Sequence, residues 1–375
     1  MSYTYSMPTK VFSGKGCIVA HSAAIRAHGS KAMLVTGRSS AKKNGSQADV
    51  IKALEKEGMD YVVFDKVMSN PTIACSYEGA AFARKNKVDC IIAIGGGSPM
   101  DAAKAMALLA AQDIEEKDLF TGNYPGDVLP IIAVPTTAGT GSEVTQYSIL
   151  TNDAAATKTS IATPKIFPKV AYIDPRYMAG LPATTTINTA MDALSHAVEG
   201  MLSVRASVIS NALAKESIRL FAQCAPELAE APAPQWTKFS EATREQLAQC
   251  ALLAGMVIAQ TGTTAVHAMG YSLTYFKDID HGRANGLLLA EYLKFVQQDD
   301  PQLVNDILAP MQVKDVDAFQ TFLDRLLGSK ETITREEILS FSQKAMHTKN
   351  IANSRVEPTQ EDIKAMYLAS LQVNA

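Results

Sequence analysis

The stretch VDCIIAIGGGSPMDAAKAMALLAA, residues 88–111, is the strongest indication of the fold class in this sequence. It begins with a nearly unbroken apolar run, Val88–Ile94, which is typical of a strand buried on both faces of a parallel sheet. Three glycines follow, and Ser98 with Pro99 then marks the start of a helix. A strand that passes through a glycine turn into a helix is the unit from which helix-covered parallel sheets are built.

The same alternation continues on both sides of this stretch. Apolar runs at 31–36, 61–65 and 129–134 are predicted strands, and amphipathic stretches at 47–58 and 73–87 are predicted helices. All the connections are short. The first half of the chain is therefore predicted to be an α/β domain with a parallel sheet.

Two glycine-rich turns follow strands of this sheet. Gly95, Gly96 and Gly97 precede one helix, and PTTAGTGSEVT, residues 135–145, follows the 129–134 strand. Glycines let main-chain N–H groups approach a phosphate, and the helix dipole favours its charge. The run lacks the GxGxxG spacing and a plain strand-to-helix turn looks similar, but two such loops at one sheet edge indicate a nucleotide site.

The second half of the chain has a different pattern. From about residue 184 the sequence predicts long helices, among them 188–203, 207–225, 240–260 and 285–297, with almost no strand signal. A chain of 375 residues is long for one core. We therefore expect two domains, an α/β domain at 1–181 and an all-helical domain at 182–375.

A pair of metal ligands is predicted in MDALSHAVEG, residues 191–200. Asp192 and His196 are four residues apart in a predicted helix, so both side chains lie on one face and can converge on one point. Such a pair alone is more often a surface pair or a satisfied buried histidine. His267 in AVHAMG and His281 in DIDHGRAN supply further imidazoles beside small or turn-forming residues.

These four side chains suit a borderline divalent ion. Three imidazoles and one carboxylate favour Fe²⁺ or Zn²⁺ over Ca²⁺ or Mg²⁺, which prefer all-oxygen ligands. The donor set does not separate Fe²⁺ from Zn²⁺. Since the ligands lie in the helical half and the glycine loops in the sheet half, the active site is expected in the cleft between the domains.

Composition limits the possible partners. The net charge of −3 gives no indication of nucleic acid or an anionic membrane as a partner, and no apolar run is long enough to span a bilayer. The five cysteines are scattered, odd in number and free of CxxC spacing, which indicates reduced thiols in a cytoplasmic protein without a secretory signal. A homodimer is a further expectation, because exposed strand edges often self-associate.

Five motifs in order make the chain resemble the iron-containing (group III) alcohol dehydrogenase family. They are GGGSPMDAAKA, PTTAGTGSEVT, DALSHAVEG, VHAMG and HGRANGLLL, and the resemblance covers essentially the whole chain. It implies an α/β dinucleotide-binding domain like that of dehydroquinate synthase, an all-helical C-terminal domain and a metal between them. The implied reaction is metal-dependent hydride transfer between NAD(P)(H) and a small alcohol or aldehyde.

The resemblance also implies roles for individual residues. The family's metal ligands fall on Asp192, His196, His267 and His281. Its pyrophosphate loop falls on Gly96, Gly97 and Ser98, followed by Asp101, and its nicotinamide-side loop falls on Thr136, Thr137 and Thr140. Asn70, Lys158 and Leu181 match cofactor-contacting positions, although a turn, a solvated surface or core packing also explains each one.

One departure from the family concerns the cofactor. Many NAD-using relatives have an Asp after the first long strand, where this chain has Gly37. The missing carboxylate leaves room for a 2′-phosphate, and Arg38, Ser39, Ser40, Lys42 and Lys43 offer donors and positive charge. We therefore expect NADP(H) to be preferred over NAD(H). The alternative is that these residues form a solvated basic turn with no role in cofactor binding.

A second departure is Tyr271, where many relatives have a further His; this residue is expected to influence substrate shape or proton exchange. Three alternative functions stay open. The first is a zinc-dependent polyol dehydrogenase of the glycerol type that uses NAD. A lyase like dehydroquinate synthase would need more Lys and Arg than the helical half contains. A non-catalytic structural relative would have no need to keep four ligands together.

Overall fold

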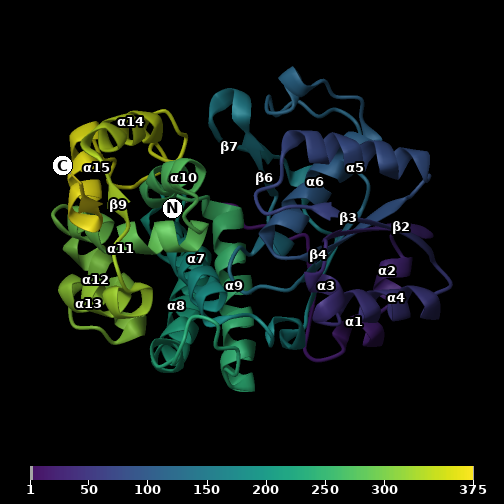
Figure 1. Ribbon diagram of the computed structural model, residues 1–375, viewed down its shortest axis with the longest axis horizontal. Helices are drawn as coiled ribbons and strands as arrows, with labels where there is room; N and C mark the ends of the chain where they lie inside the picture. The colour runs from purple at the N-terminus through teal and green to yellow at the C-terminus, as the bar shows by residue number, and fades with distance from the viewer. Residues whose placement is uncertain (1–2, 375) are drawn as a thin grey trace. The chain divides into compact units, whose positions relative to one another are not determined.

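Figure 1 shows a computed structural model that describes residues 3–374. The chain divides into two compact units, one spanning Met7–Gly180 and the other starting at Leu181. The described residues before Met7 belong with the second unit, where the backbone of Ser6 exchanges hydrogen bonds with the Gln260 side chain. The sequence analysis predicted that these residues and Leu181 belong to the α/β domain at 1–181.

The first unit contains a six-stranded, entirely parallel sheet. Its strand order is β1-β8-β5-β4-β2-β3. The strands are β1 (Lys10–Ser13), β2 (Lys31–Gly37), β3 (Asp60–Val67), β4 (Cys90–Gly95), β5 (Ile131–Pro135) and β8 (Val170–Ile173). Every residue of β4 and β5 is buried, as expected for central strands covered on both faces.

Helices cover the two faces of this sheet. They are α1 (Cys17–Ala20), α2 (Ala23–Arg26), α3 (Ser40–Lys43), α4 (Ser46–Lys56), α5 (Ile73–Lys85) and α6 (Gly97–Ala111). Alternate strand residues such as Leu34, Ile92 and Ile132 form one core cluster with apolar residues of α1 to α4. Figure 1 shows α5 and α6 on the opposite side of the strands from α1 and α4.

The predicted strands and helices of this unit agree with the structure to within two residues at each end. The sequence analysis missed an antiparallel hairpin formed by β6 (Tyr147–Asn152) and β7 (Thr157–Ala162). The hairpin contacts α6, and Thr151 bridges to Thr72 at the start of α5. It thereby lies beside the residues that were predicted to bind the cofactor.

The second unit is helical. Its helices are α7 (Ala183–Leu202), α8 (Val208–Ala229), α9 (Glu241–Thr261), α10 (Ala265–Lys277), α11 (His281–Gln297), α12 (Pro301–Leu308), α13 (Val316–Leu327), α14 (Arg335–Met346) and α15 (Gln360–Ser370). One short parallel pair, β9 (Thr332–Ile333) with β10 (Gln372–Val373), departs from the all-helical expectation. The pairing joins segments 40 residues apart, so local sequence gives little indication of it.

Helix α7 is central to this unit, because α8, α9 and α11 all pack against it. Most of its residues are buried, including the polar ones that carry the site described below. Among the described residues, no single helix is long and apolar enough to cross a membrane; α9 and α10 meet those criteria only as a pair, and a bend of 111° separates them. All five cysteines are free, and four of them are buried.

Candidate metal centre and cofactor loops

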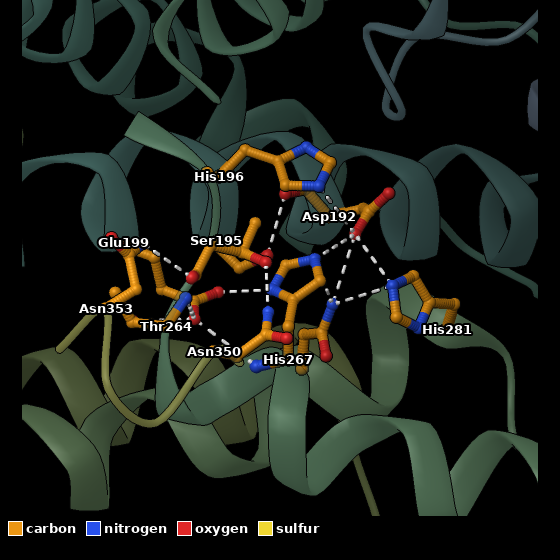
Figure 2. Close-up of polar contacts among 12 residues, drawn as sticks. Asp192, Ser195, His196, Glu199, Thr264, His267, His281, Asn350 and Asn353 are labelled. Atoms are coloured by element: carbon orange, nitrogen blue, oxygen red, sulfur yellow. Dashed lines mark hydrogen bonds and ion pairs between the residues drawn. The ribbon is translucent and has the colours of Figure 1, made fainter. Parts of the chain in front are cut away.

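Helix α7 carries two of the proposed metal ligands on one buried face. Asp192 is 3% exposed and His196 is 5% exposed, and the four-residue spacing places the His196 Nε2 3.6 Å from the Asp192 Oδ1. His267 comes from α10 and His281 from the first residue of α11. Three helices therefore contribute to the site, as Figure 2 shows.

All three imidazoles converge on one oxygen. The Asp192 Oδ1 lies 3.7 Å from the His267 Nε2 and 3.8 Å from the His281 Nε2. Ligand atoms of a tetrahedral ion with bonds of about 2.1 Å are separated by about 3.4 Å. The observed separations from Asp192 are close to that value, and the ligand atoms of Asp192, His267 and His281 all lie within 4.8 Å of one another, a group that does not include His196. With His196 added, the N3O donor set is the one that suits Fe²⁺ or Zn²⁺. The residues present therefore fit a divalent metal.

Gly282 allows His281 to reach this point. A Cβ at Gly282 would lie 1.8 Å from the Asn188 backbone oxygen and 3.0 Å from the Asp192 Cβ, so only glycine permits this approach of α11 to α7. The predicted helix began at Asn285, four residues too late. The sequence predicted that small or turn-forming residues beside His281 allow a close approach; in the structure Gly282 lies inside α11 and permits this close packing.

The site holds ionised carboxylates in a buried environment. Burial alone would raise the pKa of Asp192, but the three imidazoles and the Asn285 amide outweigh it and hold that pKa below its usual range. Burial would lower the pKa of His267, yet the adjoining Glu199 carboxylate raises it above the usual value. The carboxylates thus supply the negative charge that a buried cation requires.

Sequence reasoning missed two buried residues of this site. Asn285 directs its Nδ2 toward Asp192 Oδ1, His267 Nε2 and His281 Nε2, at 3.2, 3.2 and 3.3 Å. Glu199 contacts the His267 Nδ1 and accepts hydrogen bonds from Thr264. A helical-face argument could have found both, since Asn285 follows His281 by four residues and Glu199 follows His196 by three.

Tyr271 lies beside the ligands, as expected for the position that departs from the family pattern. Its ring stacks on the His281 ring, with centroids 5.7 Å apart and planes 7° apart, and it meets the His267 ring edge-on. Tyr271 is one turn beyond His267 on α10, which explains why one side chain touches both imidazoles.

In the sheet unit, the two glycine-rich loops lie against each other. A Cβ at Gly96 would be 2.9 Å from the Thr137 Oγ1, and one at Gly97 would be 2.8 Å from the Thr140 Cγ2. The Thr136 N–H donates to the Gly95 carbonyl at 2.9 Å. The structure therefore brings the predicted pyrophosphate and nicotinamide loops together at the carboxyl ends of β4 and β5.

Three further predicted cofactor residues join this cluster. The Ser98 Oγ accepts a hydrogen bond from the Asn70 N–H at 3.2 Å, and the Lys158 Nζ donates to the Asn70 Oδ1 at 2.8 Å. Asn70 has a φ of 55°, a left-handed conformation that asparagine tolerates better than most residues. Lys158 comes from β7, so the unpredicted hairpin is what delivers it.

A buried polar network lies behind these loops. The Lys104 Nζ, on α6, donates to Ser142 Oγ, Thr145 Oγ1 and the Tyr147 carbonyl, and Ser142 also donates to Asp101. Burial lowers the pKa of Lys104 to about 8 and raises that of Asp101 to about 6. This network fixes residues 142–147 to α6.

The remaining predicted cofactor residues occupy two other places. Gly37 ends β2, and the exposed Arg38, Ser39 and Ser40 follow it; Lys42 pairs with Asp65 of β3 at 2.8 Å. Leu181 opens the helical unit, where its carbonyl accepts a hydrogen bond from Arg244.

A parallel-sheet unit with these loops and a helical unit with a candidate metal centre at Asp192, His267 and His281 define a class, the metal-dependent dehydrogenases that share the dehydroquinate synthase fold. The family model described as iron-containing alcohol dehydrogenase matches residues 8–175, and the one for the C-terminal part of that family matches residues 186–371. The chain belongs to the iron-containing alcohol dehydrogenase family.

Individual proteins agree with this assignment. The chain is 37% identical to 1,3-propanediol dehydrogenase of Citrobacter freundii, over 74% of this chain and 71% of the relative. It is 30% identical to NAD-dependent methanol dehydrogenase of Bacillus methanolicus, over 78% and 75%. An iron-containing alcohol dehydrogenase from Thermotoga maritima has 35% identity and a TM-score of 0.91, over 99% of each chain. The protein is an alcohol or aldehyde oxidoreductase of the iron type.

Proposed function

We propose that the protein reduces small aldehydes with NADPH, and oxidises the corresponding alcohols with NADP⁺, at the Asp192, His196, His267 and His281 centre. The observation that carries this proposal is the convergence of three Nε2 atoms on the Asp192 Oδ1, at 3.6 to 3.8 Å in a buried site. The family supports the reaction class.

The four ligands would hold a divalent ion, with Fe²⁺ favoured and Zn²⁺ also suited. When bound, such an ion supplies Lewis acidity that stabilises negative charge on the substrate oxygen. Asp192 contributes the ionised carboxylate, and the histidines contribute neutral imidazole nitrogens. The half-buried Tyr271, stacked on His281, is proposed to limit substrate shape and to take part in proton exchange with solvent.

The sheet unit is proposed to bind the dinucleotide. The cofactor supplies the hydride in reduction and accepts it in oxidation, and the protein orients it. The residues proposed to bind it are Gly37, Arg38, Ser39, Ser40, Asn70, Gly96, Gly97, Ser98, Asp101, Thr136, Thr137, Thr140, Lys158 and Leu181. Support for Gly96, Gly97, Thr136, Thr137 and Thr140 comes from the contact between the 95–98 and 136–140 loops.

The preference for NADP(H) rests on Gly37 and the basic residues after it. The methanol dehydrogenase relative is NAD-dependent by name, so NADP(H) would be a departure within the family. A Cβ at Gly37 would lie 3.5 Å from the Val67 carbonyl and 3.9 Å from the Ser40 Oγ, which is ordinary contact. A Cβ therefore fits there, and the absence of a side chain at Gly37 supports space for a 2′-phosphate beside Arg38 and Ser39.

Gly37→Asp tests this preference. The variant should fold normally and should lower kcat/KM for NADPH while raising it for NADH, because the carboxylate repels a phosphate and accepts a hydrogen bond from a ribose hydroxyl. Lys66→Ala, on the same sheet unit but in an exposed pair with Glu78, is the matched control. A wild-type kcat/KM ratio of NADPH over NADH below one would refute the preference.

The reaction itself is tested on metal-stripped protein. NADPH oxidation is followed with a panel of small aldehydes and ketones after addition of Fe²⁺, Zn²⁺ or no ion. Turnover restored by one of the ions supports the proposal and identifies a working metal. Full activity in the metal-free sample, or no turnover despite tight metal binding, would overturn it.

A further inference from the structure

Glu199 is a buried carboxylate that the metal-ligand set leaves unexplained. It lies on α7, seven residues after Asp192, and its side chain is fully buried. A carboxylate in such a place is costly unless every oxygen is hydrogen-bonded. Figure 2 shows where those bonds go: toward Thr264 and His267, away from Asp192.

Both oxygens of Glu199 are used at the start of α10. Oε1 accepts from the Thr264 N–H and the Thr264 hydroxyl, each at 2.8 Å, and from the His267 N–H at 3.3 Å. Oε2 contacts the His267 Nδ1. The first N–H groups of a helix have no partner within it, and this carboxylate accepts from two N–H groups at the start of α10, which fixes that end of α10 to α7.

The contact at Nδ1 determines what the other ring nitrogen can do. An imidazole binds a cation through a nitrogen that carries no proton, and a neutral ring has its single proton on one nitrogen only. A carboxylate at Nδ1 holds the proton there, which leaves the lone pair on Nε2. In this chain that Nε2 is the atom directed at the Asp192 Oδ1.

A second layer holds the same segment from the other side. The Asn353 Nδ2 donates to the carbonyls of Thr261 and Thr263, and the Asn350 Nδ2 donates to the Thr263 hydroxyl. These bonds fix the turn that leads from α9 into α10 (Figure 2). The backbone before His267 is thus held independently of Glu199, so Glu199 can be tested without releasing the whole turn.

We propose that Glu199 is a positioning residue that holds His267 in the Nδ1-protonated tautomer, with Nε2 directed at the ion, and so sets the affinity of the centre for its metal. This inference rests on the proposed metal centre. It goes further by assigning a function to Glu199, which lies within the DALSHAVEG motif but had no role among the proposed ligands.

Metal affinity of the full-length protein tests the proposal without measuring turnover. Co²⁺ and Zn²⁺ dissociation constants are measured by competition with a chromophoric chelator, and the Co²⁺ absorption bands report the ligand geometry. Glu199→Gln keeps the size of the side chain but replaces the ionised acceptor with an amide. We expect its affinity to fall roughly 10- to 100-fold, as for other outer partners of metal-bound histidines, with altered Co²⁺ bands.

Glu227→Gln is the matched control. Glu227 also accepts hydrogen bonds from a backbone N–H and a hydroxyl, those of Ser240, and it lies in the same unit on α8. It contacts none of the four ligands in the hydrogen bonds of the described residues. Its substitution should leave Co²⁺ affinity unchanged even if it lowers Tm.

A double-mutant cycle isolates the route through His267. If Glu199 acts on that imidazole, Glu199→Gln should have little further effect on Co²⁺ affinity in a His267→Ala background. The positioning role would be overturned if Glu199→Gln lowered Co²⁺ affinity equally in the wild-type and His267→Ala backgrounds. It would also be overturned if Glu199→Gln alone kept the wild-type affinity and spectrum. Should the Gln variant fail to fold, Glu199→Asp retains the carboxylate, so its Co²⁺ affinity should lie closer to wild type than that of Glu199→Ala; equal losses in these two variants would count against the proposal. Failure of the wild-type protein to bind Co²⁺ or Zn²⁺ would instead refute the metal centre itself.

Discussion

Asp192 is the residue on which the other ligands converge, because its Oδ1 is within 3.8 Å of all three Nε2 atoms. Asp192→Asn keeps the shape and removes the charge that a buried cation needs. We expect the affinity for Zn²⁺ to fall by more than about 100-fold, since loss of a direct ligand should exceed the effect of an outer partner. Metal content of the purified variant by elemental analysis checks this, and stoichiometric metal would contradict it.

Lys158 connects the cofactor cluster to the hairpin, and its Nζ is 2.8 Å from the Asn70 Oδ1. Lys158→Ala removes a cation beside the proposed phosphate loop, and charge-assisted hydrogen bonds are the stronger ones. We expect the KM for NADPH to rise roughly 10- to 100-fold with little change in Tm. An unchanged KM would assign Lys158 to a surface role only.

The residues around the proposed metal centre differ in how far the sequence predicts them. The four proposed ligands could be named because their spacing and their residue types are those of a metal site. Helical spacing could have placed Glu199 and Asn285 near the ligand face, but not assigned their roles, because Glu199 acquires its role from Thr264, 65 residues later, and Asn285 from Asp192, 93 residues earlier. Their functions depend on how α7, α10 and α11 pack, which the local pattern does not specify.

At the scale of elements, Lys104 joins α6 to residues 142–147 through three hydrogen bonds. Lys104→Met would leave Ser142 and Thr145 without this partner and Glu143 without a neighbouring cation. We expect unfolding free energy to fall by about 3 kcal/mol, as when one member of a buried charge network is removed. The KM for NADPH should rise because residues 142–147 are held less firmly, while the affinity for Zn²⁺ stays unchanged. An unchanged KM together with a weaker affinity for Zn²⁺ would contradict this role.

Glu143, in the same segment, gives a pH-dependent prediction. Burial raises its pKa from 4.5 to about 7 in the folded protein, so between these values the folded state holds more protons than the unfolded one. Raising the pH through this window therefore destabilises the fold, by at most about 3 kcal/mol from this group. Glu143→Gln should gain stability relative to wild type between pH 5 and pH 8. Denaturant unfolding at both values checks it, and a constant difference would refute it.

The sequence predicted most helices and strands as the correct type, but it missed one hairpin and the first residues of one helix. Apolar runs identified β2, β3, β4 and β5, because strands buried on both faces of a parallel sheet have nearly continuous apolar sequences. The β6–β7 hairpin is half-exposed and lacks such a run, and the start of α11 contains glycines that look like a turn. Both misses affected the site, because the hairpin supplies Lys158 and α11 begins with His281.

On the scale of the whole molecule, the sheet unit and the helical unit carry different halves of the proposed chemistry. The dinucleotide loops all belong to Met7–Gly180, and the four ligands all follow Leu181. The order of motifs along the sequence predicts the same division, with the glycine loops in the first half of the chain and the four proposed ligands in the second. The division also means that the two ligands of the enzyme should stabilise different sets of amides.

Metal binding should therefore protect one unit selectively. An ion that binds only the folded state stabilises it by about 4 kcal/mol at a free concentration 1,000 times its Kd. Because the ligands lie on α7, α10 and α11, we expect Zn²⁺ to slow amide hydrogen exchange in those helices and to leave β4 and β5 nearly unchanged. NADPH should give the reverse pattern.

Hydrogen exchange followed by mass spectrometry, on metal-stripped protein with and without Zn²⁺, measures this directly. Asp192→Asn is the control, since it keeps every element and removes the central ligand; Zn²⁺ should give it no protection. Protection of β4 and β5 as strong as that of α7 would mean that the two units open as one cooperative block. Protection of neither would mean that the ion does not bind at Asp192, because no site on three helices can be filled without restraining them.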